Sequence, residues 1–414
     1  MSENVPVPTV MAECDKKRSG IALCLSGGGF RASLFHLGAL RRLNELGVLA
    51  RLAALSSVSG GSIFSAFLAN QCQTHGIPSG LAFANWEAQV AVPFRSFVSR
   101  DLRTFPVLAH LLWNWYLPSI RVRHVERRYG RRLTRLRLSE LPQSPEFIIC
   151  ATDLVFGVNW EFRRDGGGDY QAGYATSIAE WPLARAVAAS ACFPPVFGPV
   201  RVGLSANEFE TGNYRGDKRD KLVEAVCLSD GGVYDNMGLE PVWKNHEWVL
   251  VSDCGAPFGF QASKTPVRRL LRYTGVVTNQ AIALRKRLFF SSLNKEKFRG
   301  AYWGIASTNQ PDEVAGGPAK GYSCDLVEEV IDKIRTDLDA FTVAEQCVLE
   351  NHGYLVADDS LRRHAAELLG SAIPAPAIPH PDWMDEAKVR KALKNSHRRF
   401  SVGRIITTMR ERRK

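Results

Sequence analysis

Three turns of this sequence hold residue types that could perform chemistry. One of them, residues 57–61 (SVSGG), approximates G-x-S-x-G, a sharp strand-to-helix turn that exposes a serine hydroxyl. The serine is Ser59, and Ser57 stands where the motif has its first glycine. A hydroxyl at such a turn can act as a nucleophile once a base removes its proton. The alternative is a serine that caps a helix rich in glycine and serine.

A carboxylate that could serve as this base stands in a second turn. Asp230 follows an apolar run and precedes Gly231 and Gly232. The carboxylate therefore lies at the end of an expected strand, at the edge of the sheet where α/β proteins build their sites. An ordinary Asp-Gly-Gly turn is the alternative interpretation.

The third turn, residues 26–31 (SGGGFR), is rich in glycine. Backbone N–H groups at Gly27, Gly28 and Gly29, ahead of a helix, could bind an anion such as the oxyanion of an acyl-transfer reaction. The same turn satisfies G-x-G-x-x-A through Gly27, Gly29 and Ala32, the fingerprint of a dinucleotide site. A plain tight turn is the third interpretation.

No histidine presents itself as the usual base for a serine nucleophile. His36 lies within an expected helix and is interpreted as structural. His246 lies at a polar helix end, and His352 lies in a helical segment without a glycine turn beside it.

The segments around these turns alternate between strand and helix patterns. Short apolar runs predict buried strands, and leucines at helical spacing from Arg31 predict a helix that ends at Gly47. Such alternation predicts an α/β layered core. The expected strands are residues 20–26, 52–58, 147–151, 222–228 and 248–252, and the expected helices are residues 31–46, 60–70, 178–192, 267–292, 325–338 and 343–351, with a further helical pattern after Asp235.

Together the three turns resemble the patatin-like phospholipase family. Residues 151–154 (ATDL) and 188–197 (AASACFPPVF) add to the resemblance, and all these motifs occur in the family's order within residues 20–253. The resemblance implies an α/β fold, a three-layer α/β/α patatin-like sheet, to which the later segments add C-terminal helices. It also implies a Ser/Asp dyad without histidine, with Ser59 as nucleophile and Asp230 as base. The glycine turn would form the oxyanion hole, and Arg31 would hold that turn in shape and add positive potential near a lipid phosphate.

This resemblance implies hydrolysis of ester bonds in phospholipids or related acyl lipids, without a metal or an organic cofactor. Acyl transfer by the same dyad is an alternative, because water or another alcohol can attack an acyl-enzyme. Some bacterial relatives act as membrane-degrading effectors in antiphage defence, a role that the resemblance permits.

The formal net charge of +11 is concentrated in two basic regions. Residues 388–414 hold eleven Lys and Arg and one acid, a net +10, and residues 121–137 hold eight Arg and one Glu, a net +7. The rest of the chain carries −6, so attraction to an anionic membrane surface should be directional. Nucleic acid is not an expected partner, because no motif of a nucleic-acid-binding fold accompanies the charge.

An aromatic segment precedes the first of these basic regions. Residues 94–120 bring Phe, Leu and Trp beside arginines, as in an amphipathic segment that lies in a membrane interface. We predict that this segment forms a lid or an acyl-binding wall over Ser59, with a core helix and its solvated neighbour as the alternative. The residues expected to contact substrate or membrane are Leu111, Leu112, Trp113 and Trp115.

Composition excludes several classes of protein. The 414 residues, 45% hydrophobic and 23% charged, are typical of a folded globule and not of a disordered or fibrous chain. No apolar run approaches the roughly 18 residues that a membrane-spanning helix needs. The first residues do not form a secretory signal, and nine cysteines without a CxxC pair indicate reduced thiols. We therefore expect a cytoplasmic protein with peripheral membrane association.

Four regions and two rival functions complete the prediction. We expect a flexible N-terminus over residues 1–19, a catalytic domain with a C-terminal helical part over residues 20–370, a proline-rich linker over residues 371–387 and a basic tail over residues 388–414.

A dinucleotide-dependent oxidoreductase is one rival function, but an acidic ribose partner is missing at the end of the second strand. A non-enzymatic membrane-binding module, resting on the two basic regions, is the other.

Overall fold

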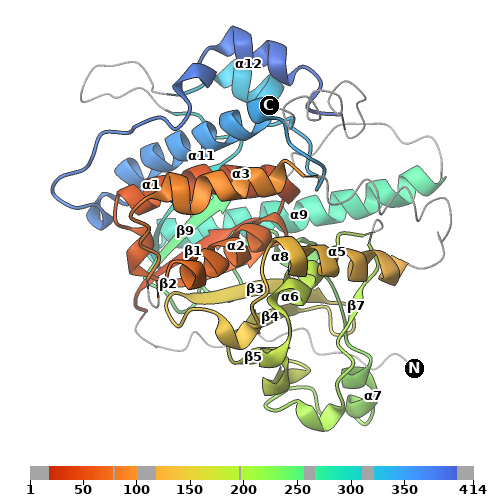
Figure 1. Cartoon of the computed structure of the whole chain (residues 1–414). Helices are drawn as coiled ribbons and strands as arrows, with labels where there is room; N and C mark the ends of the chain where they lie inside the picture. Colours follow the sequence, from red (N-terminus) through yellow and green to blue (C-terminus); the bar gives the residue numbers. More distant parts are fainter. Residues whose placement is uncertain are drawn as a thin grey trace.

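The fold is built on one mixed sheet flanked by helices (Figure 1). The computed structural model describes residues 18–77, 80–100, 118–194, 197–255, 266–309 and 321–398. The strands are β1 (Ile21–Leu25), β2 (Leu52–Val58), β3 (Glu146–Asp153), β4 (Asn159–Arg163), β5 (Gly166–Asp169), β6 (Gly173–Ala175), β7 (Val200–Arg201), β8 (Cys227–Asp230), β9 (Trp248–Asp253) and β10 (Arg299–Gly304). The helices are α1 (Gly29–Glu45), α2 (Gly60–Thr74), α3 (Val92–Val98), α5 (Pro118–Arg132), α6 (Leu183–Ser190), α7 (Arg219–Glu224), α8 (Gly232–Asp235), α9 (Pro266–Asn294), α10 (Cys324–Leu326), α11 (Val343–His364) and α12 (Glu386–Leu393).

The sheet has the strand order β10-β9-β1-β2-β3-β4-β5-β6. The strands from β10 to β3 are parallel, whereas β4, β5 and β6 continue the sheet as antiparallel neighbours. β8 pairs with β3, and β7 pairs with β8, also in antiparallel fashion. Parallel strands joined through helices need both faces covered, so this topology requires helices on each side.

Alternating side chains of the parallel strands supply the two cores. In β1, Leu23 and Leu25 belong to the larger core, which also contains apolar side chains of α1, α2, α6 and α11. Ala22 and Cys24 belong to the second core, which contains residues between Met237 and Val242 and side chains of α9. Because successive side chains of a strand point to opposite faces, helices cover both faces of the sheet. The predicted three-layer α/β/α architecture, with further helices at the C-terminus, is confirmed.

Two glycines let α1 and α11 approach each other closely above the sheet (Figure 1). A Cβ atom on Gly38 of α1 would lie 1.8 Å from the carbonyl oxygen of Glu350, and one on Gly353 of α11 would lie 2.0 Å from that of Phe35. Only glycine fits at such backbone contacts. α11 therefore fixes the helix that follows the glycine-rich turn.

The ends of β2 and β8 meet at one edge of β3. Val58, the last residue of β2, pairs with Cys150, and the next residue of β3, Ala151, pairs with Asp230. β4 occupies the other edge of β3, where Trp160 pairs with Ala151. The register alone therefore brings the residue after Val58 next to Asp230.

Most expected elements are confirmed within a few residues, but α11 continues 13 residues beyond the expected end at residue 351, and the expected helix 178–192 is limited to α6, residues 183–190. Three other expected elements are wrong. Residues 222–228 were expected as one strand but divide into the end of α7 and the start of β8. After Asp235 the helix stops, because the Asp235 carboxylate accepts the N–H groups of Met237, Leu239 and Glu240 in place of helical carbonyls. Helical geometry also ends at Ile331 rather than at residue 338. Beyond it, the carbonyls of Asp332 and Ile334 accept hydrogen bonds from the Arg31 guanidinium in place of helical N–H groups.

The first basic region forms most of α5, which packs against the core. Val122, Val125 and Tyr129 are buried on one side of α5, while Arg123 and Arg127 are exposed.

In the expected proline-rich linker, residues 371–380 form neither helix nor strand, and the carbonyl of Pro374 accepts a 2.6 Å hydrogen bond from Arg42. α12 then spans the end of the expected linker and the start of the expected basic tail.

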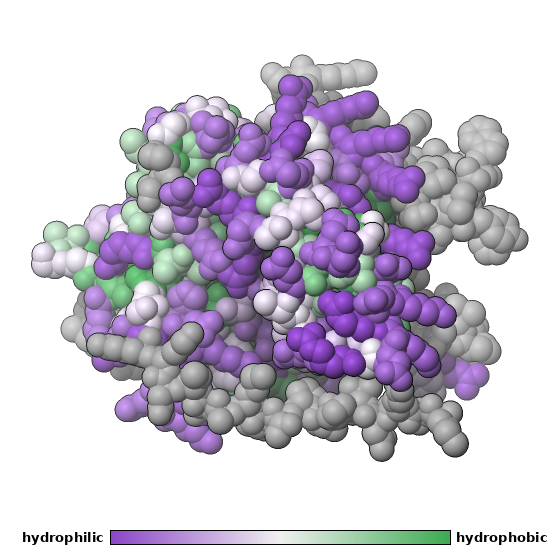
Figure 2. All heavy atoms as spheres, turned by 90° about the horizontal axis from the view of Figure 1, so that it is seen from below, coloured by the Kyte–Doolittle hydropathy of each residue, from purple (hydrophilic) through white to green (hydrophobic). Residues whose placement is uncertain are grey.

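The surface over the antiparallel end of the sheet is mostly hydrophilic. Figure 2 views the molecule from this side and shows polar residues across most of the visible surface, with apolar residues in small groups. Among the helices that the structure describes, none combines the length and the apolar character needed to cross a bilayer.

Candidate active site

Ser59 lies at the sharp turn between β2 and α2. Its backbone adopts φ 50° and ψ −113°, a conformation that side-chain-bearing residues rarely hold. The glycines behind it permit the turn, since a Cβ atom on Gly60 would lie 2.2 Å from the carbonyl oxygen of Gly29. A Cβ atom on Gly61 would lie 2.4 Å from that of Leu25. Strain of this kind persists only where the surrounding structure enforces it.

Ser190, at the end of α6, ties the Ser59 turn to β3. Its hydroxyl accepts the backbone N–H of Ser59 at 2.9 Å and donates to the carbonyl of Cys150 at 2.6 Å. The hydroxyls of Ser62 and Ser190 are also 2.9 Å apart. Because Ser190 is buried, these hydrogen bonds are shielded from water and stabilise the strained turn.

Asp230 is a buried carboxylate whose Oδ1 accepts the backbone N–H of Gly232 at 2.8 Å. Burial raises the pKa of Asp230 to about 7, although this hydrogen bond and the neighbouring Ser59 side chain act in the opposite direction. This carboxyl group can therefore gain and lose a proton near neutral pH.

The glycine-rich turn lies against Ser59. A Cβ atom on Gly27 would be 3.1 Å from the Cβ atom of Ser59. Gly28 and Gly29 have φ values of 145° and 59°, which glycine adopts without strain. The N–H of Gly27 donates to the carbonyl of Asn236 at 3.0 Å. In the described part of the chain, no acceptor binds the backbone N–H groups of Gly28, Gly29 or Arg31, which lie at the positive end of the 17-residue helix α1.

The Arg31 side chain is buried and joins the glycine turn to later parts of the chain. Its guanidinium donates to the carbonyls of Cys254 and Gly255 after β9, at 2.9 and 2.8 Å. It also donates to the carbonyls of Asp332 and Ile334, both at 2.9 Å. These contacts agree with the expected support of the turn. With its Nη donors directed at carbonyls, the guanidinium is a structural tie and is not presented to a lipid phosphate.

The sequence model of one family matches this region of the chain. The model of the patatin-like phospholipases covers residues 23–243, more than half of the 414 residues, and includes all three turns. The chain belongs to this family. This match confirms the resemblance seen in the sequence.

Solved structures give more distant similarities to this patatin-like chain. Human GIVD cytosolic phospholipase A2 is 12% identical, with a TM-score of 0.44 over 92% of this chain and 63% of the human one. VipD from Legionella pneumophila is 13% identical, with a TM-score of 0.34 over 84% of this chain and 67% of VipD. The chain thus spans less than two thirds of the human structure. No curated protein sequence matches it, so the family assignment rests on the family model.

Histidines of this patatin-like protein play no part in the described contacts of Ser59 and Asp230. The ring nitrogens of His36 contact the hydroxyl of Ser252 at 2.8 Å and the carbonyl of Ser26 at 3.0 Å. Burial lowers the pKa of His36 to about 4, so this ring is neutral at physiological pH. His36 therefore supports the backbone of the glycine turn, in agreement with the structural role expected for it.

Two residues near Ser59 and Asp230 had no expected role. Asn236 accepts the N–H of Gly27, and its side-chain oxygen fills the space beside Gly27 and Gly232. Ser190 belongs to the segment 188–197, which contributes to the family resemblance but suggests no role for any one residue. No spacing signal could have found either, because each acts across strands that are distant in sequence.

The expected substrate- or membrane-contact residues Leu111, Leu112, Trp113 and Trp115 lie outside the described residues. The same aromatic segment begins with Phe94 and Phe97, and these two are core residues. The Phe94 ring packs edge-on against Phe64 and Phe67 of α2, with centroids 4.9 and 5.0 Å apart. The start of the segment therefore belongs to the core and not to a membrane interface, which corrects the prediction for residues 94–97.

Proposed function

We propose that this protein is a serine hydrolase of phospholipids or related acyl lipids, in which Ser59 is the nucleophile and Asp230 the general base. One observation carries the proposal: Ser59, at a strained turn, lies beside a buried carboxylate whose pKa is raised to about 7. A base is most effective when its pKa lies near the working pH, and burial supplies that pKa here without a histidine.

In the first step, Asp230 takes the hydroxyl proton as the Ser59 oxygen attacks the ester carbonyl carbon. The carbonyl oxygen becomes an oxyanion, which the free N–H groups of Gly28 and Gly29 would stabilise. The helix α1 behind them adds a partial positive charge. Asp230 then gives the proton to the departing alcohol, and the acyl group stays on Ser59.

In the second step, water attacks the acyl-enzyme. Asp230 takes a proton from the water, and the tetrahedral intermediate collapses to a fatty acid and a free Ser59 hydroxyl that regains the proton. An alcohol in place of water would yield an acyl-transfer product by the same route. Analysis of products with and without an added alcohol separates the two reactions.

Replacement of Ser59 by Ala tests the nucleophile. We expect hydrolysis of a fluorogenic acyl ester to fall by at least about 1,000-fold, because no other group forms the acyl-enzyme. Folding, measured by circular dichroism, should be preserved, since alanine removes only the hydroxyl. Ser65→Ala is a matched control, because the Ser65 hydroxyl on α2 is buried and makes no hydrogen bond in the structure.

Retained turnover in Ser59→Ala would refute the assignment of the nucleophile. Vesicle binding by the unmodified protein without any ester hydrolysis would instead support a non-enzymatic membrane-binding module.

A further inference from the structure

Helix α9 exposes four large apolar side chains along one side. Tyr273, Val277, Leu284 and Leu288 are 65%, 69%, 57% and 44% exposed. These residues follow one another at intervals of four, seven and four positions, which places them on one side of an α-helix. Scattered apolar residues are normal on a protein surface, but a stripe along one helix marks an interaction surface.

The charge of α9 is of a single sign. Its 29 residues contain five Arg and one Lys, and no Asp or Glu. Arg285 and Lys286 turn inward, where they bind Glu240 at 2.9 Å and Asp253 at 2.8 Å. Arg269 and Arg287 are exposed beside the apolar stripe, and within the described residues neither has an ion-pair partner. The outward face is thus apolar with a cationic border.

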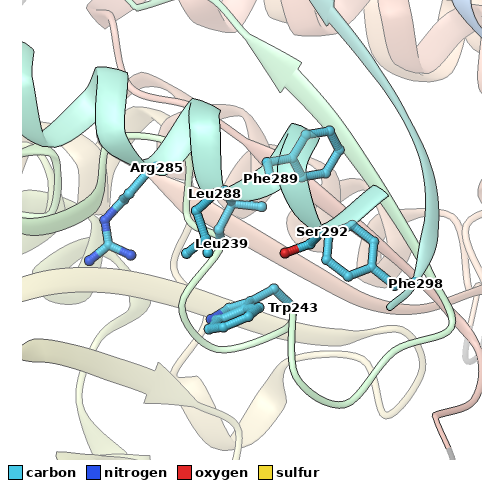
Figure 3. A pocket seen from close by; sticks show the side chains of 7 residues that line it. All are labelled: Leu239, Trp243, Arg285, Leu288, Phe289, Ser292 and Phe298. Carbon is cyan, nitrogen blue, oxygen red and sulfur yellow. The ribbon is translucent and has the colours of Figure 1, made fainter. Parts of the chain in front are cut away.

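The same helix is attached directly to the turn that carries Asp230. Arg285 donates to the carbonyl of Tyr234 at 3.2 Å and lies 3.7 Å from the Asp235 carboxylate. Leu288, at the end of the stripe, also lines a small apolar hollow (Figure 3). The hollow lies between α9 and the chain that follows α8, and its other lining residues include Leu239, Trp243, Phe289 and Phe298.

We propose that α9 is an interfacial helix that docks this enzyme on an anionic lipid bilayer. An apolar stripe bordered by arginines matches the boundary between acyl chains and negatively charged headgroups. The absence of any acidic residue along the helix favours this partner, because no group on it would repel the headgroups. The proposal rests on the proposed function only in assuming that the bilayer supplies the substrate.

Binding to vesicles tests α9 separately from catalysis. The Ser59→Ala protein is used so that the lipid stays intact, and cosedimentation is measured with phosphatidylcholine vesicles with or without phosphatidylglycerol. Val277→Gln/Leu284→Gln should lower the affinity for the anionic vesicles at least about tenfold. Arg269→Gln/Arg287→Gln should reduce the difference between anionic and neutral vesicles. The matched control is Val92→Gln/Val343→Gln, whose two valines are 51% and 46% exposed on α3 and α11; it should bind as the parent does.

Hydrolysis by the same α9 variants with Ser59 present gives the second readout. Loss of activity on anionic vesicles with unchanged activity on a short soluble ester supports the docking role. Unchanged vesicle binding in both α9 variants overturns it, as does an α9 substitution that only dissociates a dimer of this chain. If the unmodified protein hydrolyses no ester, the proposed function fails, while the cosedimentation result still decides the role of α9.

Discussion

The dyad proposed here depends on the burial of one carboxyl group. An exposed aspartate has a pKa near 4 and is a poor base for a serine hydroxyl. Asp230 is buried beside β3, and its pKa rises to about 7 although the hydrogen bond from Gly232 and the neighbouring Ser59 side chain both lower it. His36 does not share this role, because its ring nitrogens contact the Ser252 hydroxyl and the Ser26 carbonyl, and burial lowers its pKa so that it is a weak base. Desolvation thus acts on both groups but prepares only the carboxylate for catalysis.

The raised pKa of Asp230 predicts how the rate depends on pH. Only the ionised carboxylate accepts the Ser59 proton, so kcat/KM should rise with pH and level off above a midpoint near 7. Below the midpoint the rate should fall about tenfold per pH unit, because the ionised fraction does so. The measurement is kcat/KM on a short soluble ester from about pH 5 to pH 9. A rate that is flat over this range, or that rises toward acid, would contradict the role of Asp230.

At the residue scale, the sequence predicts the chemical groups but not the contacts that hold them in place. Ser59 and Asp230 could be named because each stands at a turn with a recognisable pattern, although their catalytic roles stay predictions. The contact between Ser190 and Ser59 joins positions 131 residues apart. Such contacts arise only when α6 packs beside β3, and no local pattern reports that packing.

At the scale of elements, apolar runs buried on both faces were the most predictable. β2 spans the predicted residues 52–58, and β9 extends its predicted strand by one residue. Elements that end on a tertiary contact were not predictable. α8 ends after one turn, where the Asp235 carboxylate accepts the backbone N–H of Leu239. Beyond Ile331, the Arg31 guanidinium donates hydrogen bonds to the carbonyls of Asp332 and Ile334. In both places a distant or folded-back polar group replaces the helical hydrogen bonds that the local sequence would allow.

The close crossing of α1 and α11 predicts the effect of Gly38→Ala. The new methyl group would meet the backbone of α11 at Glu350, so the helices would have to separate. We expect the free energy of unfolding to fall by about 1–3 kcal/mol, measured by urea denaturation. Gly275→Ala on α9 is the control, because a Cβ atom there meets nothing within 4 Å and alanine favours a helix. Equal stability in the two variants would show that the crossing tolerates a side chain.

At the scale of the whole molecule, residues beyond the family match complete the fold around the glycine turn. The match ends at residue 243, but the carbonyl of Asp337 accepts the N–H of Phe30 at 2.9 Å. The carbonyls of Cys254 and Asp332 bind the Arg31 side chain. The glycine turn is therefore held in shape by the C-terminal part of the chain.

A chain that ends at residue 320 should not fold as an independent domain. It would lack α11 and the Asp337 contact, and would expose the apolar face of α1. We expect differential scanning calorimetry to show no cooperative transition for this fragment, and co-expression of residues 321–414 to restore one. A transition at the temperature of the full chain, without the second fragment, would contradict this dependence.

Net charge is informative at this scale only when the fold locates it. Counting charges along the sequence identifies two basic regions and gives the rest of the chain a net charge of −6. The six basic residues of α9 belong to that remainder, so their positive charge does not appear in the count. In the fold, Glu240 and Asp253 neutralise the inward side of α9, while its outward side keeps arginines beside an apolar stripe. The candidate membrane surface thus depends on how helix and loops pack, which the charge count cannot show.

Covalent labelling with an alkyl fluorophosphonate tests the central claim most directly. An activated serine attacks the phosphorus and expels fluoride, so the modified residue can be identified by mass spectrometry of peptides. The account predicts one adduct per chain, on Ser59, that forms more slowly in Asp230→Asn and is absent in Ser59→Ala. A stoichiometric adduct on another residue, with Ser59 unmodified and activity lost, would contradict it.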